Sequence, residues 1–280
     1  MAELDGMVAV ITGGASGIGE RSAELFVEEG ARVVIADLQR DRGEALADRL
    51  GPDAVFVPCE VSQESDVKAV IDAAMSQWGR LDCLFNNAGF GGVLGPLEDV
   101  PVEEFDLTMA VLVRGVYLGI KHASPIMKSQ GAGSIVNTGS IAGITAGRGP
   151  QVYSVAKAAV IHMTKVTAMQ LAEHRVRVNC ICPGYIATPL SANTVGRPDD
   201  LIEQRVRNYD QRQPIPRVGR PDDIAQLALW LAGSRSEFVT GQAWVVDGGV
   251  TVGTNWAEQA EVYKTFRPIT VYRPEADQQG

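Results

Sequence analysis

Cysteine and histidine are scarce in this sequence. Four cysteines and three histidines are scattered over 280 residues, without the close spacing of metal ligands or the cysteine density of a disulfide-linked secreted domain. We therefore expect buried, reduced thiols and no bound metal. Cys180 and Cys182 flank Ile181 on one predicted strand, and we expect their side chains to point to opposite faces of the sheet.

Positive charge and long apolar runs are also lacking. Lys and Arg number 25 against 34 Asp and Glu, which gives a net charge of −9, so the phosphate backbone of a nucleic acid would be repelled. No apolar stretch approaches the roughly 20 residues that span a bilayer, and the N-terminus has no basic segment ahead of an apolar run. We therefore expect a cytoplasmic protein with neither nucleic acid nor a membrane as partner.

Short β-branched runs alternate with longer helical patterns along the chain. The predicted strands are Val8–Thr12, Arg32–Ala36, Ala54–Pro58, Cys83–Phe85, Ser134–Thr138, Arg177–Cys182 and Ala243–Val246. The predicted helices are Ile18–Glu29, Arg40–Leu50, Glu64–Trp78, Phe105–Lys128, Gln151–Glu173 and Asp222–Ala232. Continuously apolar strands are buried on both faces, and βαβ alternation gives a parallel sheet with right-handed crossovers. The pattern predicts an α/β fold with one doubly wound parallel sheet and helices on both faces.

A glycine-rich turn directly follows the first predicted strand and opens the first helix. It contains Gly13, Gly17 and Gly19. Glycines let the backbone approach a pyrophosphate closely, and a helix N-terminus offers N–H groups and the positive end of a dipole. Because three residues rather than one separate the first two glycines, a tight turn without a ligand stays the alternative.

Asp37 follows the second predicted strand. A carboxylate at this position accepts hydrogen bonds from the adenosine ribose hydroxyls of NAD and repels the 2′-phosphate of NADP. An Asp at a strand end also starts turns, and the nearby Arg40 keeps NADP open as an alternative. The sequence therefore favours NAD as the cofactor.

Tyr153 and Lys157 lie four residues apart in a predicted helix that follows Ser140. Side chains at this spacing share a helix face, with Cβ atoms about 5–6 Å apart, so a phenol and an ammonium can share one pocket. Lowering a tyrosine pKa from about 10 to about 7 requires roughly 4 kcal/mol, which one positive charge about 4 Å away supplies in a partly dry pocket. The pair is therefore a candidate acid/base centre.

In their order and separation these motifs resemble those of the short-chain dehydrogenase/reductase family, from about Asp5 to Gly249. The matching stretches are Thr12–Gly19, Asn86–Gly89, Ser140, Tyr153 with Lys157, Pro183-Gly184 with Thr188, and Val246–Gly249. The sequence is also similar to the branch that contains secoisolariciresinol dehydrogenase and cyclic-alcohol dehydrogenases. The resemblance implies a seven-stranded Rossmann-type domain that transfers a hydride between a nicotinamide cofactor and a CH–OH group.

The resemblance also implies roles for individual residues. Tyr153 would be the general acid/base, Lys157 would lower its pKa and bind the nicotinamide ribose, and Ser140 would hydrogen-bond the substrate oxygen. The cofactor-binding residues would be Gly13, Ser16, Gly17, Ile18, Gly19, Asp37, Leu38, Glu60, Val61, Asn87, Ala88, Gly89, Tyr153, Lys157, Pro183, Gly184, Ile186 and Thr188.

One position departs from the family pattern. Leu112 stands where many members carry an Asn that holds a water linked to the lysine. A leucine side chain cannot bind that water. We expect either proton exit by another route, through backbone carbonyls or Thr108, or slower turnover.

We assign residues 1–249 to a single dinucleotide-binding catalytic domain. Within it, residues 188–220 form a polar substrate lid with a short helix at Asp200–Tyr209. Residues 250–280 form a C-terminal extension whose aromatic residues favour docking, on its own subunit or a neighbour, over disorder. These aromatic residues are Trp256, Tyr263, Phe266 and Tyr272.

The residues expected around the substrate are almost all apolar. They are Phe90, Gly91, Gly92, Val93, Leu94, Ile141, Ala142, Gly143, Ile144, Tyr185 and Leu190. Such a lining fits a hydrophobic, cyclic or aryl-bearing secondary alcohol or ketone, although packing against the sheet is an alternative for Ile141 and Leu94. An NAD-dependent alcohol dehydrogenase is the leading prediction. A ketone or 3-oxoacyl reductase and a non-catalytic nucleotide-binding protein are the alternatives.

The two longest predicted helices, Phe105–Lys128 and Gln151–Glu173, carry apolar residues around much of their circumference. Among these residues are Val116, Tyr117, Ile120, Val160, Met163 and Met169. A single subunit would bury only part of this surface. The family resemblance implies that these helices pair between subunits, and we expect a homotetramer.

Overall fold

The computed structural model describes residues 2–191, 202, 206, 209 and 213–266. Its centre is a sheet of seven parallel strands in the order β3-β2-β1-β4-β5-β6-β7. The strands are β1 (Val8–Thr12), β2 (Arg32–Asp37), β3 (Ala54–Pro58), β4 (Cys83–Asn86), β5 (Gly133–Thr138), β6 (Val176–Pro183) and β7 (Ala243–Val246). Every predicted strand is confirmed, and no end differs by more than one residue.

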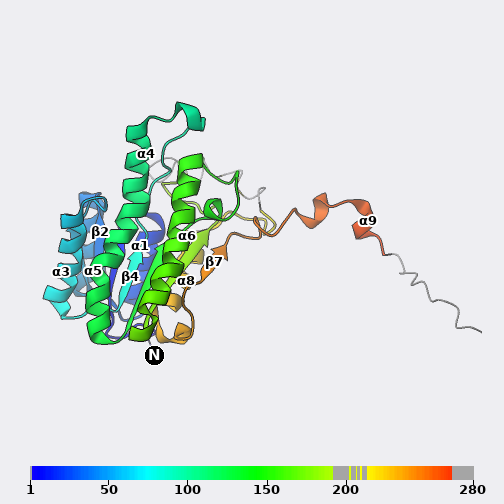
Figure 1. Cartoon of the computed structure of the whole chain (residues 1–280). Coiled ribbons are helices and arrows are strands. Elements are labelled where there is room, and N and C mark those ends of the chain that lie inside the picture. The colour runs from blue at the N-terminus through cyan, green and yellow to red at the C-terminus, as the bar shows by residue number, and fades with distance from the viewer. Residues whose placement is uncertain (1, 192–201, 203–205, 207–208, 210–212, 267–280) are drawn as a thin grey trace, which may run out of the picture.

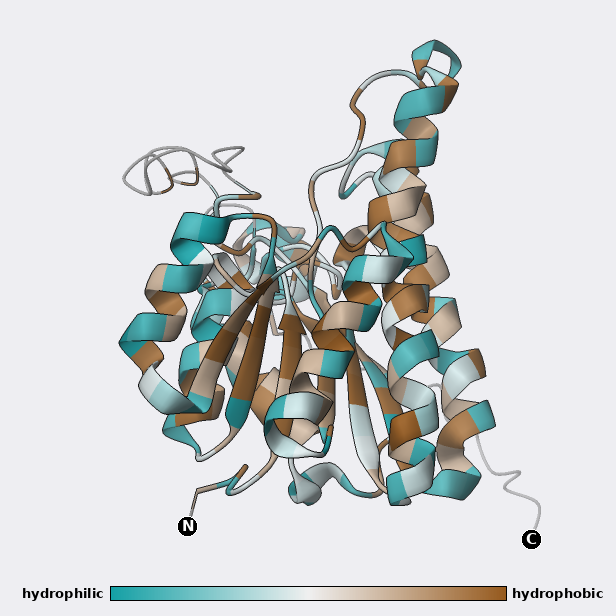
Figure 2. Cartoon of the chain, turned by 90° about the vertical axis from the view of Figure 1, so that its left-hand side faces the viewer, coloured by the Kyte–Doolittle hydropathy of each residue, from teal (hydrophilic) through white to brown (hydrophobic). Residues whose placement is uncertain are grey.

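Helices cover both faces of this sheet (Figure 1). They are α1 (Gly17–Glu28), α2 (Arg40–Leu50), α3 (Glu64–Trp78), α4 (Val102–Met109), α5 (Gly115–Gln130), α6 (Gln151–Leu171), α8 (Pro221–Ala232) and the short α9 (Glu261–Lys264). One apolar cluster joins α1, α2 and α8 to the sheet, and a second cluster joins α3, α5 and α6 to its other face. Figure 2 shows hydrophobic strands between these helix layers. The predicted doubly wound α/β fold is confirmed.

Strand β1 shows why the apolar runs form a sheet that is buried on both sides. Val8 and Val10 belong to one apolar cluster, whereas Ala9 and Ile11 belong to the other. Successive side chains of a strand point to opposite faces, so a strand between two helix layers needs an apolar residue at every position. The apolar run stops at Gly13, where the glycine-rich turn begins.

The long helix predicted at Phe105–Lys128 differs from the structure. Helix α4 begins three residues earlier, at Val102, and a π-helical turn, Ala110–Arg114, separates α4 from α5. A π-helical turn has i→i+5 hydrogen bonds and is frequent at functional sites. Leu112 lies inside this turn and is fully buried.

Val250 is still buried, but the chain after it leaves the body of the protein, and the segment that carries α9 extends away from the sheet (Figure 1). Trp256, Tyr263 and Phe266 are 63%, 71% and 91% exposed. These described aromatic residues therefore do not dock on their own subunit. Tyr272, most of the predicted lid and most of its short helix lie outside the described residues. Within the described ranges, no helix has the length and apolar character needed to cross a membrane.

Candidate active site

The winding of the sheet changes direction between β1 and β4. From β1 the chain proceeds outward through β2 to β3, and from β4 it proceeds through β5 and β6 to β7. In open parallel sheets, ligands bind beyond the carboxyl ends of the strands at this point. Gly13 follows β1, Asn87 follows β4, and Ser140 lies just after β5. The candidate site therefore occupies this crevice.

Close approach of the backbone explains the glycines after β1. A Cβ atom on Gly13 would lie 2.7 Å from the Ala88 Cα, and one on Gly19 would collide with the Gly13 carbonyl. Gly13 also has a φ of 63°, which favours glycine. The side-chain amide of Asn87 donates to the carbonyls of Thr12 and Gly13, both at 3.2 Å. The glycine-rich turn and the loop after β4 therefore pack directly against each other at the N-terminus of α1.

Asp37 ends β2 and faces the glycine-rich turn. Its carboxylate accepts hydrogen bonds from the backbone N–H groups of Ala15 at 3.0 Å and of Gln39 at 2.9 Å. Asp37 is buried, whereas its neighbour Leu38 is exposed. A carboxylate is therefore held in a fixed position next to the turn.

Glu60 and Val61 follow β3 on the same side of the crevice. The Glu60 carboxylate accepts from the Ser62 backbone N–H at 3.1 Å, and this single contact leaves acceptor capacity on its oxygens. Val61 is buried, and a Cβ atom on Gly115 of α5 would lie 3.0 Å from the Val61 side chain. Val61 therefore packs against α5 between the end of β3 and that helix.

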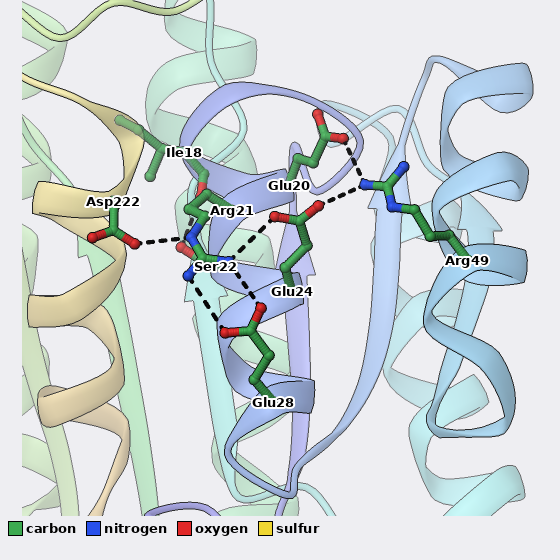
Figure 3. Close-up of polar contacts among 8 residues, drawn as sticks. All are labelled: Ile18, Glu20, Arg21, Ser22, Glu24, Glu28, Arg49 and Asp222. Carbon is green, nitrogen blue, oxygen red and sulfur yellow. Dashed lines mark hydrogen bonds and ion pairs between the residues drawn. The ribbon is translucent and has the colours of Figure 1, made fainter.

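Ion pairs hold α1 against its neighbours on both sides (Figure 3). Arg21 pairs with Asp222 of α8 at 2.8 Å, and Arg49 of α2 pairs with Glu20 and Glu24 at 3.0 and 2.6 Å. All five side chains are partly exposed, so each pair contributes only about 0–1 kcal/mol. As a network, the pairs link the helix whose N-terminus faces the crevice to both of its neighbours.

The residues of this crevice fit a nicotinamide dinucleotide. Ser16 precedes α1 but its side chain does not cap the first turn, so backbone N–H groups there are available to a pyrophosphate. Gly13 and Gly17 keep side chains away from that position, and Asp37 offers acceptors for ribose hydroxyls. When bound, such a cofactor supplies the hydride donor or acceptor.

The residues predicted to contact the nicotinamide lie after β6. Pro183 ends the strand and Gly184 follows it. Ile186 and Thr188 are buried, and a Cβ atom on Gly17 would lie 3.3 Å from the Thr188 side chain. The structure thus brings this loop next to the glycine-rich turn, as binding of one dinucleotide by both segments requires.

Three polar side chains meet beyond the end of β5. The Ser140 hydroxyl accepts a hydrogen bond from the Ala142 backbone N–H at 3.1 Å, and Ser140 also forms a hydrogen bond with the Tyr153 phenol. The Lys157 Nζ donates to the Thr138 carbonyl at 2.8 Å and lies 5.6 Å from the centre of the Tyr153 ring. Helix α6 supplies Tyr153 and Lys157, so one helix and one strand end build the centre that the sequence indicated.

Burial determines the protonation of this centre. Desolvation raises the pKa of Tyr153, and the hydrogen bond with Ser140 offsets only part of that effect. Desolvation also lowers the pKa of Lys157 to about 8, against the opposing charges of Cys180 and Cys182. The net effect of the surroundings is to keep the phenol protonated, and the expectation that Lys157 lowers the pKa of Tyr153 stays a prediction.

Leu112 and Lys157 both lie close to Gly89 in the loop after β4. The Leu112 Cδ2 lies 3.2 Å, and the Lys157 Nζ 3.8 Å, from the position of a Cβ atom on Gly89. Thr108 donates its hydroxyl to a carbonyl one turn earlier in α4 at 2.8 Å and accepts from the Val93 N–H at 3.2 Å. The Thr108 hydroxyl therefore anchors the loop after β4, a role that the sequence did not indicate.

The prediction that Cys180 and Cys182 point to opposite faces is wrong. Their Sγ atoms are 4.0 Å apart and both residues are fully buried, because side chains two residues apart on a strand share a face. The four cysteines are buried and free, as predicted. Sequence reasoning missed this contact, although the period of two along β6 was a signal that could have found it.

The predicted substrate residues fall into different environments. A Cβ atom on Gly92 would lie 3.5 Å from the Tyr153 Cβ, so this loop reaches the catalytic centre. Ile141 is buried, which agrees with the packing alternative, whereas Leu94 is 74% exposed and Ile144 is also exposed. The described residues contain no group of three or more His, Cys, Asp or Glu side chains that could hold a metal ion.

The chain is similar in sequence and in fold to known proteins over most of its length. A family model described as enoyl-(acyl carrier protein) reductase matches residues 13–251. Momilactone A synthase of Oryza sativa subsp. japonica is 42% identical over 255 residues, which cover 89% of this chain and 92% of that protein. Mitochondrial borneol dehydrogenase of Lavandula x intermedia is 38% identical over 250 residues, with coverage of 89% and 92%. The crystal structure of levodione reductase matches with a TM-score of 0.83 at 31% identity, covering 90% of this chain and 100% of that chain.

Proposed function

Because the chain belongs to the short-chain dehydrogenase/reductase family, whose members act on CH–OH groups, we propose that it is an NAD-dependent dehydrogenase of a hydrophobic, cyclic or aryl-bearing secondary alcohol. The main support is the meeting of Ser140, Tyr153 and Lys157 at one point beside the glycine-rich turn. With all three residues present, we do not retain the non-catalytic alternative.

The proton chemistry follows from the contacts of the three residues. The Ser140 hydroxyl accepts from the Ala142 N–H, so its own proton is available to the substrate oxygen. In alcohol oxidation, Tyr153 accepts the hydroxyl proton of the substrate as a hydride leaves the carbinol carbon. The Lys157 ammonium lies beside the phenol and stabilises the negative charge of its deprotonated form.

We propose NAD rather than NADP because of Asp37. Its buried carboxylate is held by two backbone N–H groups next to the glycine-rich turn. Ribose hydroxyls can donate to the remaining acceptor sites of this carboxylate, whereas a 2′-phosphate would bring like charges together. The exposed Arg40 pairs with Glu44 at 3.1 Å, which occupies it within its own helix.

The reductive direction is the second candidate, and the state of Tyr153 favours it. Burial raises the pKa of Tyr153, so the phenol holds the proton that ketone reduction requires from a general acid. Reduction and oxidation use the same residues in opposite directions. The pH dependence of the two rates separates the candidates, since oxidation should accelerate toward alkaline pH and reduction should slow.

The substrate class is proposed from the apolar loops and from the relatives. Gly92 and the buried Ile141 and Ala142 bring little polarity to the region around Tyr153. Borneol, named in one relative, is a cyclic secondary alcohol. A compact apolar alcohol of this kind therefore fits better than a charged metabolite.

We also propose a homotetramer in which α4, α5 and α6 pair between subunits. Tyr117 and Met169 are 51% and 81% exposed, and an apolar groove runs between α4, α5 and α6 past Leu107, Val113 and Met163. Three of the apolar residues expected at this interface cannot contact a second subunit, because they are buried in the core of their own subunit. These residues are Val116, Ile120 and Val160. Light scattering that gives a monomer mass would contradict this proposal.

The domain boundaries and the location in the cell also remain proposals. We retain a catalytic domain at 1–249 with a lid at 188–220, followed by an extension at 250–280. Limited proteolysis that removes the extension and leaves an active core would support these boundaries. Cell fractionation would test the expected cytoplasmic location.

A spectrophotometric screen tests the proposed function. Purified protein is mixed with NAD or NADP and a panel of cyclic and aryl secondary alcohols, and the matching ketones are tested with the reduced cofactors. We expect oxidation of at least one cyclic alcohol, with NAD preferred. A preference for NADP would overturn the role of Asp37, and no reaction with any alcohol or ketone would overturn the proposed function.

A further inference from the structure

One serine, Ser191, connects the residues after β6 that are predicted to contact the nicotinamide. Its hydroxyl donates to the Ile186 carbonyl and also lies 3.0 Å from the Thr188 carbonyl, so these two acceptors share its proton. The same oxygen accepts from the Thr188 backbone N–H at 3.0 Å and from the Thr188 hydroxyl at 3.3 Å. A single side chain therefore joins both predicted contact residues of this loop.

Thr188 and Ser191 are hydrogen-bonded in both directions. The Ser191 backbone N–H donates to the Thr188 hydroxyl at 3.2 Å, which returns the contact that the Thr188 N–H makes with the serine. Reciprocal bonds of this kind between side chains and backbone fix a short turn. A threonine hydroxyl has one donor and two acceptor sites. Ser191 takes the donor and one acceptor site of Thr188, which leaves one acceptor site with a defined direction.

This remaining acceptor site fits the nicotinamide carboxamide. The carboxamide ends in an NH₂ group, and a hydroxyl oxygen with a free lone pair can accept from it. Thr188 is buried, and a Cβ atom on Gly17 would lie 3.3 Å from its side chain. The site at Thr188 is therefore next to the glycine-rich turn, close enough for one dinucleotide to reach both.

Other contacts hold the backbone of the same loop. Tyr209 donates its hydroxyl to the Ser191 carbonyl at 3.0 Å, and the centre of its ring lies 5.2 Å from that of Tyr185. Gly219 pairs with the loop as in a parallel sheet: its N–H donates to the Tyr185 carbonyl at 3.0 Å, and its carbonyl accepts from the Ala187 N–H at 2.8 Å. The protein thus fixes this loop through several independent bonds, and Ser191 is the one that reaches Thr188.

We propose that Ser191 is a positioning residue for the nicotinamide: its hydrogen bonds to Thr188 and Ile186 set the direction in which Thr188 accepts from the carboxamide, and hence the angle of the ring. This inference rests on the proposed function, because it requires a nicotinamide dinucleotide as cofactor. Ser191 acts through Thr188 and needs no contact with the substrate. Without it, Asp37 and the glycine-rich turn would still hold the adenosine end of the cofactor.

Binding of two ligands to Ser191→Ala tests the proposal. NADH contains the nicotinamide, whereas ADP-ribose has the same adenosine, pyrophosphate and second ribose but no nicotinamide. Calorimetry of the wild type and Ser191→Ala should show that the Kd for NADH rises about tenfold, because Thr188 loses its fixed direction. The Kd for ADP-ribose should stay within about twofold of the wild type. Equal weakening of both ligands, or an unchanged Kd for NADH, would overturn the proposal.

Three further variants isolate the hydroxyl. Ser191→Thr keeps the hydroxyl and should bind NADH nearly as the wild type does; binding as weak as that of Ser191→Ala would overturn the proposal. Tyr209→Phe keeps the ring but loses the bond to the Ser191 carbonyl, so a selective rise of about threefold in the Kd for NADH is expected.

Ser124→Ala is the matched control for the loss of a serine hydroxyl. The Ser124 hydroxyl donates to the Ile120 carbonyl at 2.6 Å in the half of α5 that leads into the amino end of β5, away from the crevice. This variant should bind both ligands as the wild type does, and a selective loss of NADH binding in it would count against the proposal. Circular dichroism confirms folding, and Tyr209→Phe decides the question if Ser191→Ala fails to fold.

Failure of this inference is distinguishable from failure of the proposed function. If the wild type binds neither NADH nor NADPH, the proposed function fails and this inference fails with it. If the wild type binds NADH and Ser191→Ala binds it equally well, only the role of Ser191 fails.

Discussion

Replacement of Lys157 by methionine should stabilise the fold at neutral pH and destabilise it at high pH. Burial lowers the pKa of Lys157 from 10.5 to about 8. Below pH 8 both the folded and the unfolded chain hold the proton, so the folded state bears the full cost of a buried charge, about 3 kcal/mol. Between about pH 8 and 10.5 the folded chain is neutral and the unfolded chain is still charged, so this cost fades as the pH rises.

Methionine removes the buried charge but also the hydrogen bond to the Thr138 carbonyl, which is 2.8 Å long. A buried carbonyl without a partner costs about 1–3 kcal/mol. The balance is a gain of about 0–2 kcal/mol in the free energy of unfolding at pH 7. Near pH 10.5, where the cost of the charge has gone, methionine should instead lower this free energy by about 1–3 kcal/mol.

Urea unfolding of the wild type and Lys157→Met at both pH values measures these differences. Lys165 lies on the same helix and is exposed, so Lys165→Met is the matched control and should change stability little at either pH. Equal destabilisation by Lys157→Met at pH 7 and pH 10.5 would refute the reasoning, because it would show that the folded protein bears no cost for this charge.

Three further substitutions test other parts of the site. Asp37→Asn removes the charge beside the turn, and we expect the ratio of kcat/KM for NADP to that for NAD to rise at least about tenfold; an unchanged ratio would show that Asp37 does not select the cofactor. Leu112→Asn should lower the free energy of unfolding by about 1.5–3 kcal/mol through lost burial, and an unchanged rate and solvent isotope effect would exclude this position from the proton path. Arg21→Ala should cost about 0.5–1 kcal/mol at low salt and less at high salt, and a cost independent of salt would count against an electrostatic role.

The sheet could be predicted from the sequence because each strand contains a run of consecutive apolar residues. Such runs fit only strands that are buried on both faces, as Val10 and Ile11 show by facing opposite clusters. The glycine-rich turn could be predicted as well, because the close approach of the backbone at Ala88 leaves no room for a side chain at Gly13. These features follow from local sequence and hence need no knowledge of the rest of the fold.

Other features depend on long-range packing and could not be predicted in the same way. The periodicity of the long helix does not reveal the π-helical turn that contains Leu112. The pKa of Tyr153 is set by desolvation within the folded protein, whereas the spacing to Lys157 alone pointed to a lowered value. The contact of the Cys180 and Cys182 thiols with Gly139 joins the end of β5 to β6 and arises only when the two strands lie side by side.

The most direct test is the oxidation of a cyclic secondary alcohol by saturating NAD, measured in the wild type and in Tyr153→Phe. Phenylalanine keeps the ring and loses only the hydroxyl that hydrogen-bonds Ser140. We expect unchanged binding of NAD and a rate lower by about 10²–10⁴-fold, the usual contribution of a general acid/base. A variant that binds NAD and oxidises the alcohol at the wild-type rate would contradict the role of Tyr153 as the group that exchanges the substrate proton.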